Sequence, residues 1–351
     1  WRRSIGSDPG RHVTEKLVIC CSEIDSATWR WVAPYFPDLT WEFVACKSRF
    51  GRGLQNFVNL GRLSAALKSV RLARRNKGAV LVTHGPTLAA WCALFARLLG
   101  VDVPILAHSF NFVALPGRLK LVVFRFALAR VRRFVVFSQV EREVYAAAFH
   151  LPIERFEFLH WSVQPPAVAS PDDPVEAGNY VAAIGGNARD YPTLIEAARE
   201  LPDVRFVLVV RPENLAGLKV PQNMSVHCNI GFGEAMNILY HARFMALPLN
   251  DAQVPCGHVT LVAAMHLGKA MVVTDSRGVR DYVFDGENAL LVEPKSPAAL
   301  AAAIRRLWDD REFCGRLAEH GRLFAAKSCT EGQVAVQFGG FLHELVAGRP
   351  Q

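Results

Sequence analysis

The sequence predicts an α/β protein with two doubly wound domains, each built on a parallel sheet that helices cover on both faces. The chain has 351 residues, which is enough for two separate cores. Short β-branched segments alternate with helical segments, and this alternation starts again after a proline-rich stretch near the middle. Hydrophobic residues make up 51% of the chain, which excludes a disordered protein.

In the first half, five short apolar segments predict buried parallel strands. They are KLVICC (16–21), WEFVAC (41–46), AVLVTH (79–84), VPILAH (103–108) and RFVVFS (133–138). Helices are expected between them at 63–75, 88–100 and 139–150. We expect Gly100 to end its helix and Ser138 to cap the next one.

In the second half, the same alternation follows residues 164–178, QPPAVASPDDPVEAG, which read as a linker. Strands are expected at 180–186, 205–210, 225–230, 244–249, 270–275 and 289–294. Helices are expected at 191–200, 233–241, 258–268, 297–309, 311–326 and 331–347. Ligands of such sheets bind beyond the carboxyl ends of the strands, beside helix N-termini.

The net charge of +8 is unevenly distributed along the chain. Residues 1–165 hold 23 Lys and Arg against 11 Asp and Glu, a net +12, and residues 166–351 hold 17 against 21, a net −4. The basic half suggests an anionic partner: a membrane surface, a phosphorylated acceptor or nucleic acid. We expect that the chain does not bind nucleic acid, because the aromatic and basic motifs of RNA-binding modules are missing from the sequence.

The eight cysteines form no CxxC pair and favour a reduced, cytoplasmic protein. The first residues, WRRSIGSDPGRHVTE, do not have the apolar region of a signal peptide. Four arginines interrupt the most apolar stretch, 119–138, so it is not expected to span a bilayer.

The stretch CGHVTLVAAMHLGKAMVVTD (256–275) contains the first candidate binding site. Cys256 and Gly257 precede the helix, and the amides of His258, Val259 and Thr260 would be its unpaired first donors. With the helix dipole, these amides suit a diphosphate. The alternative is an ordinary capped core helix.

The second candidate is AIGGNARDYPTLIEAA (183–198), where a strand ends in Gly185, Gly186 and Asn187. The glycines allow a close approach of the backbone, and Arg189 can clamp phosphate oxygens. The spacing is not that of the dinucleotide fingerprint GxGxxG. Alternatively, Arg189 is a solvated loop cation.

These elements, in this order, resemble the family-4 glycosyltransferases of the GT-B fold. The resemblance covers roughly 130 residues of the second half, through VRFVLVV, NMSVHCNIG and the stretch from Cys256 to DD at 309–310. In the first half, VTHGP (82–86), ILAHSFNF (105–112) and VVFSQVEREVY (135–145) match more faintly.

The resemblance implies two Rossmann-like domains that face a central cleft. Residues 1–165 would bind the acceptor, residues 166–328 would bind a nucleotide sugar, and a helix in 329–351 would cross back to the first domain. A sugar would pass to an acceptor hydroxyl with retention, in the synthesis of a glycan, polysaccharide or glycolipid. His84 and His108 would lie on the acceptor or sugar side, with His108 and Arg189 in catalytic roles; taken alone, each histidine reads as structural.

Two departures from the family pattern leave an alternative open. The glutamate that usually precedes "AM" is Ala263, and the earlier acidic position is Pro255. Asp251 and Asp275 are candidate replacements for the missing carboxylate. CSEIDSATWRW (21–31) also stands where a glycine-rich loop is expected. The alternative is an impaired protein of the same fold that serves as a nucleotide-binding protein or scaffold.

Neither a metal nor a cofactor is expected. Asp172 and Asp173 lie in the linker, and Asp309 and Asp310 end a helix, so neither pair is a strand-end Asp-x-Asp. HExxH and GxSxG are also missing from the sequence.

Residues 115–133 predict a basic amphipathic helix. Leu121, Phe124, Leu128 and Val131 fall on one stripe, whereas Arg118, Arg125 and Arg132 recur every seven residues on another. The helix can lie on an anionic leaflet, or its apolar stripe can simply pack on the first sheet. We therefore expect a cytoplasmic protein that associates peripherally with a membrane and takes a glycan or lipid-linked acceptor.

Overall fold

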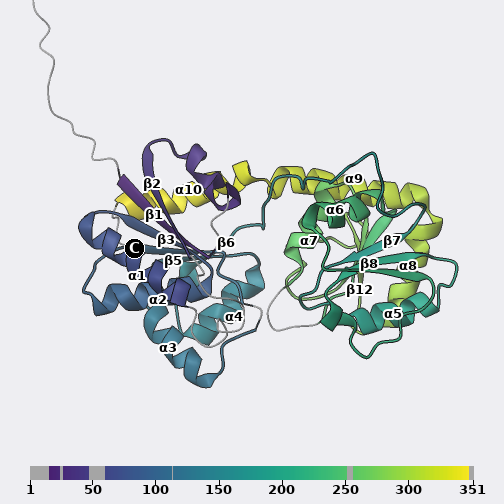
Figure 1. The fold of residues 1–351 in the computed structure, drawn as a ribbon, viewed down its shortest axis with the longest axis horizontal. Coiled ribbons are helices and arrows are strands. Elements are labelled where there is room, and N and C mark those ends of the chain that lie inside the picture. The colour runs from purple at the N-terminus through teal and green to yellow at the C-terminus, as the bar shows by residue number, and fades with distance from the viewer. Residues whose placement is uncertain (1–15, 24–26, 47–59, 113, 251–255, 348–351) are drawn as a thin grey trace, which may run out of the picture.

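The computed structural model shows two α/β domains connected by crossing segments (Figure 1). It describes residues 16–23, 27–46, 60–112, 114–250 and 256–347. Each domain contains a six-stranded sheet in which every pairing is parallel. This confirms the predicted fold class.

In the first sheet the earliest strand is second from one edge, and the strand order reverses there, as in doubly wound folds. In spatial order its strands are β2 (Leu39–Ala45), β1 (Lys16–Ser22), β3 (Val80–His84), β4 (Ile105–His108), β5 (Arg133–Val136) and β6 (Phe156–Phe158). One face is covered by α1 (Leu60–Arg75), α2 (Pro86–Leu98), α3 (Arg118–Leu128) and α4 (Gln139–Phe149). The short turns η1 (Ala27–Tyr35) and η2 (Ile153–Arg155) complete this half.

The second sheet follows the same plan. In spatial order its strands are β12 (Leu290–Val292), β11 (Met271–Thr274), β10 (Phe244–Leu247), β7 (Val181–Ile184), β8 (Phe206–Val210) and β9 (Met224–Cys228). One face packs against α6 (Phe232–His241) and α7 (His258–His266). The other packs against α5 (Tyr191–Arg199), α8 (Pro297–Asp309) and the start of α9 (Arg311–Ser328), and η3 (Pro212–Leu215) follows β8.

The last helix, α10 (Glu331–Ala347), covers the free face of the first sheet (Figure 1). Its residues Val334, Phe338 and Leu342 are buried among strand residues such as Val82 and Leu106. The first core is therefore built from both ends of the described chain.

Most predicted elements lie within a few residues of their expected bounds. Ser138 caps α4 by accepting a hydrogen bond from the Glu141 amide, as predicted. Helix α2 ends at Leu98, and Gly100 follows in the left-handed region with φ of 61°. Strand β6 was not predicted, because its three residues, FEF, are too short to show a pattern.

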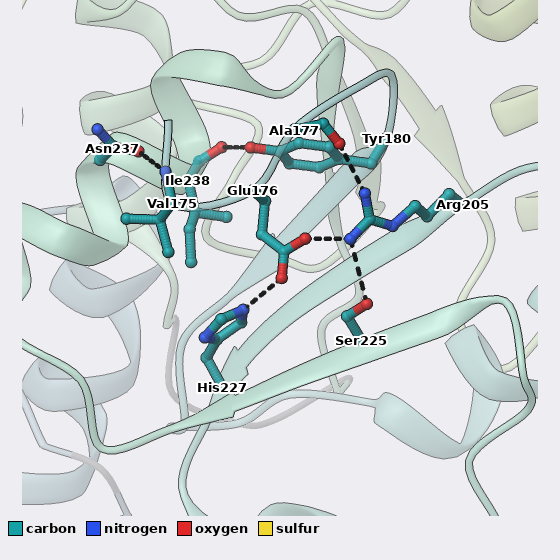
Figure 2. A network of polar contacts seen from close by, with 9 residues as sticks. All are labelled: Val175, Glu176, Ala177, Tyr180, Arg205, Ser225, His227, Asn237 and Ile238. Atoms are coloured by element: carbon teal, nitrogen blue, oxygen red, sulfur yellow. Dashed lines mark hydrogen bonds and ion pairs between the residues drawn. The ribbon is translucent and has the colours of Figure 1, made fainter. Parts of the chain in front are cut away.

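The predicted linker is attached to the second domain through hydrogen bonds between Ala169 and Ala177, and Figure 2 shows those of Val175, Glu176 and Ala177. The buried Asn237 side chain on α6 donates to the carbonyls of Ala169, Ser170 and Asp173, and accepts from the Val175 amide. The Glu176 carboxylate then pairs with Arg205 on the segment entering β8 and with His227 on β9. Proline and acidic residues correctly marked a connection, but they did not reveal that it is fastened to the sheet.

Candidate functional site

The loop after β7 leaves room for one particular side chain, that of Arg189. Gly185 has φ of 121°, and a Cβ added there would lie 2.5 Å from Nη2 of Arg189. Both the conformation and the space therefore require glycine. The Gly185 amide donates to the Val209 carbonyl at 2.9 Å, which fixes the loop against β8.

Arg189 connects this loop to the start of α7. Its Nε and Nη2 donate to the Ile184 carbonyl, both at 3.2 Å, and Nη1 donates to the Asn187 carbonyl at 2.9 Å. Nη2 also donates to the Thr260 hydroxyl at 3.0 Å. The two predicted segments, 71 residues apart in sequence, are therefore held together by one guanidinium.

The charge of Arg189 is buried without a counter-charge in the described part of the chain. Only 9% of the residue is exposed, and no described carboxylate forms an ion pair with it. Burial lowers its pKa from the ordinary value of an arginine. A buried cation satisfied only by neutral acceptors retains an unbalanced positive charge, which favours binding of an anion nearby.

The N-terminus of α7 lies beside this cation. A Cβ added at Gly257 would be 3.7 Å from Nη1 of Arg189, and Gly257 itself has φ of 103°. No described side chain caps this helix, and the Gly257 carbonyl accepts from the Leu261 amide. Among the described residues, no acceptor is hydrogen-bonded to the amides of His258, Val259 and Thr260. They are thus a set of aligned donors at the positive end of a helix.

The side chains around these amides differ in their roles. His258 is buried and its Nε2–H donates to the Gly278 carbonyl at 3.0 Å, so this N–H is already engaged within the fold. Burial lowers the pKa of His258 to about 4. Val259 is 47% exposed and Cys256 is half-buried, and burial raises the pKa of the Cys256 thiol.

Arg211 is a second cation at this loop, and it was not among the residues predicted from the sequence. Its Nη1 donates to Oδ1 of Asn187 at 3.1 Å, and its side chain lies over Gly186, where a Cβ would be 3.0 Å from the Arg211 Cδ. The sequence signal that could have identified Arg211 is its position directly after β8, at the carboxyl end of a parallel strand.

His84 and His108 are paired across β3 and β4, as the sequence analysis placed them at neighbouring strand ends. Their rings stack with centroids 6.3 Å apart. Burial lowers the pKa of His84 to about 4 and that of His108 to about 3. The His108 Nδ1 lies 3.0 Å from the Ser109 hydroxyl, and its ring contacts Phe338 of α10. Both rings are therefore neutral at pH 7.

The position of the expected glutamate is a core position in this structure. Ala263 is 2% exposed and belongs to the cluster between α7 and the second sheet. Asp275 is held by Arg280, whose Nε donates at 2.8 Å and Nη2 at 2.5 Å. Asp251 and Pro255 lie outside the described residues. Within the described ranges, no three His, Cys, Asp or Glu side chains are grouped as a metal ion would require.

The match to a known sequence family lies in the second half of the chain. Residues 180–310 match the family Glycosyl transferases group 1. A segment of 69 residues is 32% identical to EpsD of Bacillus subtilis strain 168, which is described as a glycosyltransferase. That segment covers 20% of this chain and only 18% of the length of EpsD.

Solved structures resemble nearly the whole chain, although their sequences differ. Anabaena HepE in complex with UDP has a TM-score of 0.71 at 16% identity, over 94% of this chain and 100% of that one. Sucrose-phosphate synthase from Thermosynechococcus elongatus has a TM-score of 0.73 at 15% identity, over 95% and 100%. The apo form of the lipopolysaccharide outer core galactosyltransferase WaaB has a TM-score of 0.65 at 10% identity, over 94% and 99%. The chain is thus a two-domain protein with the fold of the GT-B glycosyltransferases, and its second domain carries the sequence pattern of the group 1 glycosyl transferases.

Proposed function

We propose that this protein transfers a sugar from a nucleotide-diphosphate sugar to a hydroxyl group of an acceptor. The observation that carries the proposal is the buried Arg189, which has no carboxylate partner among the described residues and lies against the uncapped start of α7. This arrangement suits the diphosphate of the donor. HepE, whose fold this chain shares, has been solved with UDP and with UDP-glucose, which supports a nucleotide sugar as the donor class.

The proposed reaction breaks the bond between the anomeric carbon and the diphosphate oxygen, and forms a bond from that carbon to the acceptor oxygen. Arg189 and the amides of His258, Val259 and Thr260 stabilise the negative charge that develops on the leaving diphosphate. The acceptor proton passes to a phosphate oxygen, so no carboxylate nucleophile is needed, and configuration is retained. His108, neutral at pH 7, lies at the sugar side without adding a charge.

The first domain is proposed to bind the acceptor, a glycan or a lipid-linked sugar. Its net charge of +12 over residues 1–165 favours an acceptor that carries phosphate or lies at an anionic surface. We also propose that transfer requires neither a cofactor nor a metal ion, since neither an Asp-x-Asp nor an HExxH motif occurs in the sequence. Removal of metal ions with a chelator should therefore leave the rate of sugar transfer unchanged.

Isothermal titration with UDP, GDP, ADP and dTDP tests the donor site. Arg189→Ala should weaken binding of the preferred nucleotide by about 1.5–3 kcal/mol, because it removes a charge-assisted hydrogen bond. Arg189→Lys, which keeps the charge without the forked geometry, should lose less. Arg199→Ala, an exposed arginine at the end of α5, is the matched control and should bind as the wild type does.

Two results would contradict the proposal at different levels. Equal affinities of the wild type and a folded Arg189→Ala variant would remove Arg189 from the site. Tight binding of a nucleotide without release of the nucleoside diphosphate from any nucleotide sugar, in the presence of glycan and lipid-linked acceptors, would favour the scaffold alternative. Where transfer is seen, the anomeric configuration of the product by NMR tests retention.

A further inference from the structure

Helix α3 carries two apolar stripes, of which only one is used inside the protein. Leu121, Phe124 and Leu128 face the first core, where Phe124 is 6% and Leu128 is 0% exposed. This stripe packs inward, as one of the two sequence interpretations predicted. A second set, which we call the outer stripe, faces solvent and comprises Leu119 (85% exposed), Val122 (60%), Val123 (47%) and Phe126 (51%).

The spacing of the outer stripe makes it a continuous surface. Its members are at positions i, i+3, i+4 and i+7, which lie on one side of an α-helix. Leu98, 68% exposed, ends the neighbouring α2 and directly follows Arg97, whose guanidinium lies over the Phe126 ring. Single exposed apolar residues are common on soluble proteins, but a contiguous row marks an interaction surface.

Cations border the outer stripe on both sides. At 3.6 residues per turn, Arg118 and Arg125 fall along one edge of it and Lys120 along the other. The Arg97 guanidinium from α2 lies 4.2 Å from the centroid of the Phe126 ring. The stripe is therefore an apolar row framed by positive charge.

Some cations of this region are satisfied within the fold, and others are not. Arg125 donates to the Ala148 carbonyl, Arg130 pairs with Asp102, and Arg133 pairs with glutamates on β6 and α10. Arg118, Lys120 and Arg132 are exposed and pair with no carboxylate of the described residues. The one ring contact recorded for them is that of Lys120 Nζ, 5.6 Å from the centroid of the Phe124 ring, which leaves the ammonium without a counter-charge. No Asp or Glu occurs in the sequence between Asp102 and Glu141, so the nearby chain supplies no acid to neutralise them.

We propose that the outer stripe of α3 docks the protein on an anionic lipid bilayer, with Leu119, Val122, Val123 and Phe126 entering the boundary between headgroups and acyl chains and Arg118 and Lys120 contacting lipid phosphates. Charge complementarity selects this occupant: a second copy docked by the same face would bring two sets of cations together, and a nucleic acid would leave the apolar row uncovered. No helix within the described residues has the length and apolarity to cross a bilayer.

The position of α3 agrees with this role. The helix lies at the lower edge of the first domain in Figure 1, on the face of the first sheet opposite to the one that α10 covers. The inference names the surface by which the proposed enzyme would reach a lipid-linked acceptor, and to that extent it rests on the proposed function.

Co-sedimentation of the full chain with vesicles of phosphatidylglycerol or phosphatidylcholine tests the proposal. The wild type should bind phosphatidylglycerol vesicles at low salt, bind less at high salt, and bind phosphatidylcholine weakly. The double variant R118Q/K120Q should bind about 25-fold more weakly, at about fivefold for each cation near the surface. The double variant L119S/V122S should also lose binding, but with a salt dependence like that of the wild type.

Matched controls lie elsewhere on the molecule. Leu323 and Val336 are 51% and 76% exposed, and L323S/V336S should bind vesicles like the wild type. Lys295 and Lys327 are exposed cations of the second half, and K295Q/K327Q should also be unaffected. These variants separate the loss of one surface from a general loss of charge or apolarity.

Three outcomes would overturn the proposal. The first is no binding of the wild type to anionic vesicles at low salt, and the second is equal losses in the α3 variants and the controls. The third is self-association in sedimentation velocity that the α3 variants abolish, because it would assign the stripe to a second copy of the chain. Nucleotide titration of the same samples is independent of lipid, so failure here leaves the proposed donor site standing.

Discussion

Glu141 is a buried carboxylate at the point where β5 turns into α4. Its Oε2 accepts from the Phe137 amide at 2.9 Å, and its Oε1 accepts from the Tyr145 hydroxyl at 2.9 Å. The Tyr145 hydroxyl in turn accepts from the Phe112 amide at 3.0 Å. Burial nevertheless dominates these bonds and raises the pKa of Glu141 to about 7.

This raised pKa predicts a stability that depends on pH in a defined direction. Between about pH 4.5 and 7, the folded protein keeps a proton on Glu141 that the unfolded chain has released, so the free energy of unfolding falls as the pH rises. Glu141→Gln should flatten this dependence and raise the free energy of unfolding at pH 8 by up to about 3 kcal/mol. Urea denaturation of both proteins between pH 5 and 8 measures the free energy of unfolding at each pH.

The control for this prediction is Glu143→Gln, an exposed glutamate on the same helix. It should leave the pH dependence as in the wild type. Parallel curves for the Glu141→Gln variant and the wild type would show that Glu141 titrates in its ordinary range.

For several residues, the identity could be selected from the sequence, but the contacts could not be predicted. Gly257 and Arg189 were selected from the local pattern, but the bond from Arg189 to Thr260 depends on the packing of two distant segments. Ala263 could be identified as a departure from the family pattern, whereas its burial in the core could not. On α3, the period of one stripe was visible, but which side faces the sheet is decided by tertiary contacts.

Among the elements, the strands were predictable and the connections were not. Buried parallel strands are short runs of β-branched and apolar residues, which a sequence displays directly. The segment 164–178 displays only proline, alanine and acid, and its path depends on one asparagine of a helix more than 60 residues later. Such side-chain anchors of the backbone leave no periodic signal.

The attachment of this segment gives a prediction about α6. Asn237→Ala removes the side-chain oxygen that accepts from the Val175 amide and the side-chain nitrogen that donates to three carbonyls. The backbone groups bonded to Asn237 therefore lose their hydrogen-bond partners. The free energy of unfolding should fall by about 1–3 kcal/mol. Limited proteolysis should cut within 164–178 faster than in the wild type.

Asn237→Asp is the informative companion variant. It keeps the oxygen that accepts from the Val175 amide and replaces only the donor group, so we expect a comparable loss. Full stability in both variants would mean that the remaining contacts, among them those of Glu176 with Arg205 and His227, are enough to hold the segment.

At the scale of the whole molecule, Tyr282 connects the second domain to the first. Its hydroxyl donates to the Phe137 carbonyl and accepts from the Trp161 amide, both at 2.7 Å. Beside it, Oδ2 of Asp281 accepts from the Gln139 amide at 2.8 Å, at the first turn of α4. One short segment of the second domain thus bonds to the end of β5, the start of α4 and the chain after β6.

Tyr282→Phe should weaken the coupling between the domains, because two backbone groups lose their partner while the ring keeps its packing. We expect the two domains to unfold over separate temperature ranges in scanning calorimetry, the weaker one earlier than in the wild type. Tyr240→Phe, at a tyrosine that is 42% exposed, should leave the trace unchanged. An unaltered transition in Tyr282→Phe would place the coupling in other contacts.

The position of α10 also has a consequence for how the protein is made. A ribosome produces β1 to β6 first, yet the face formed by residues such as Val18, Val82 and Leu106 is covered by a helix that is translated after the whole second domain. During synthesis, the second domain can therefore complete its core while the first still exposes an apolar surface. A nascent chain halted before Glu331 would leave this surface open to chaperones, which makes the first domain, although translated earlier, the later of the two to mature.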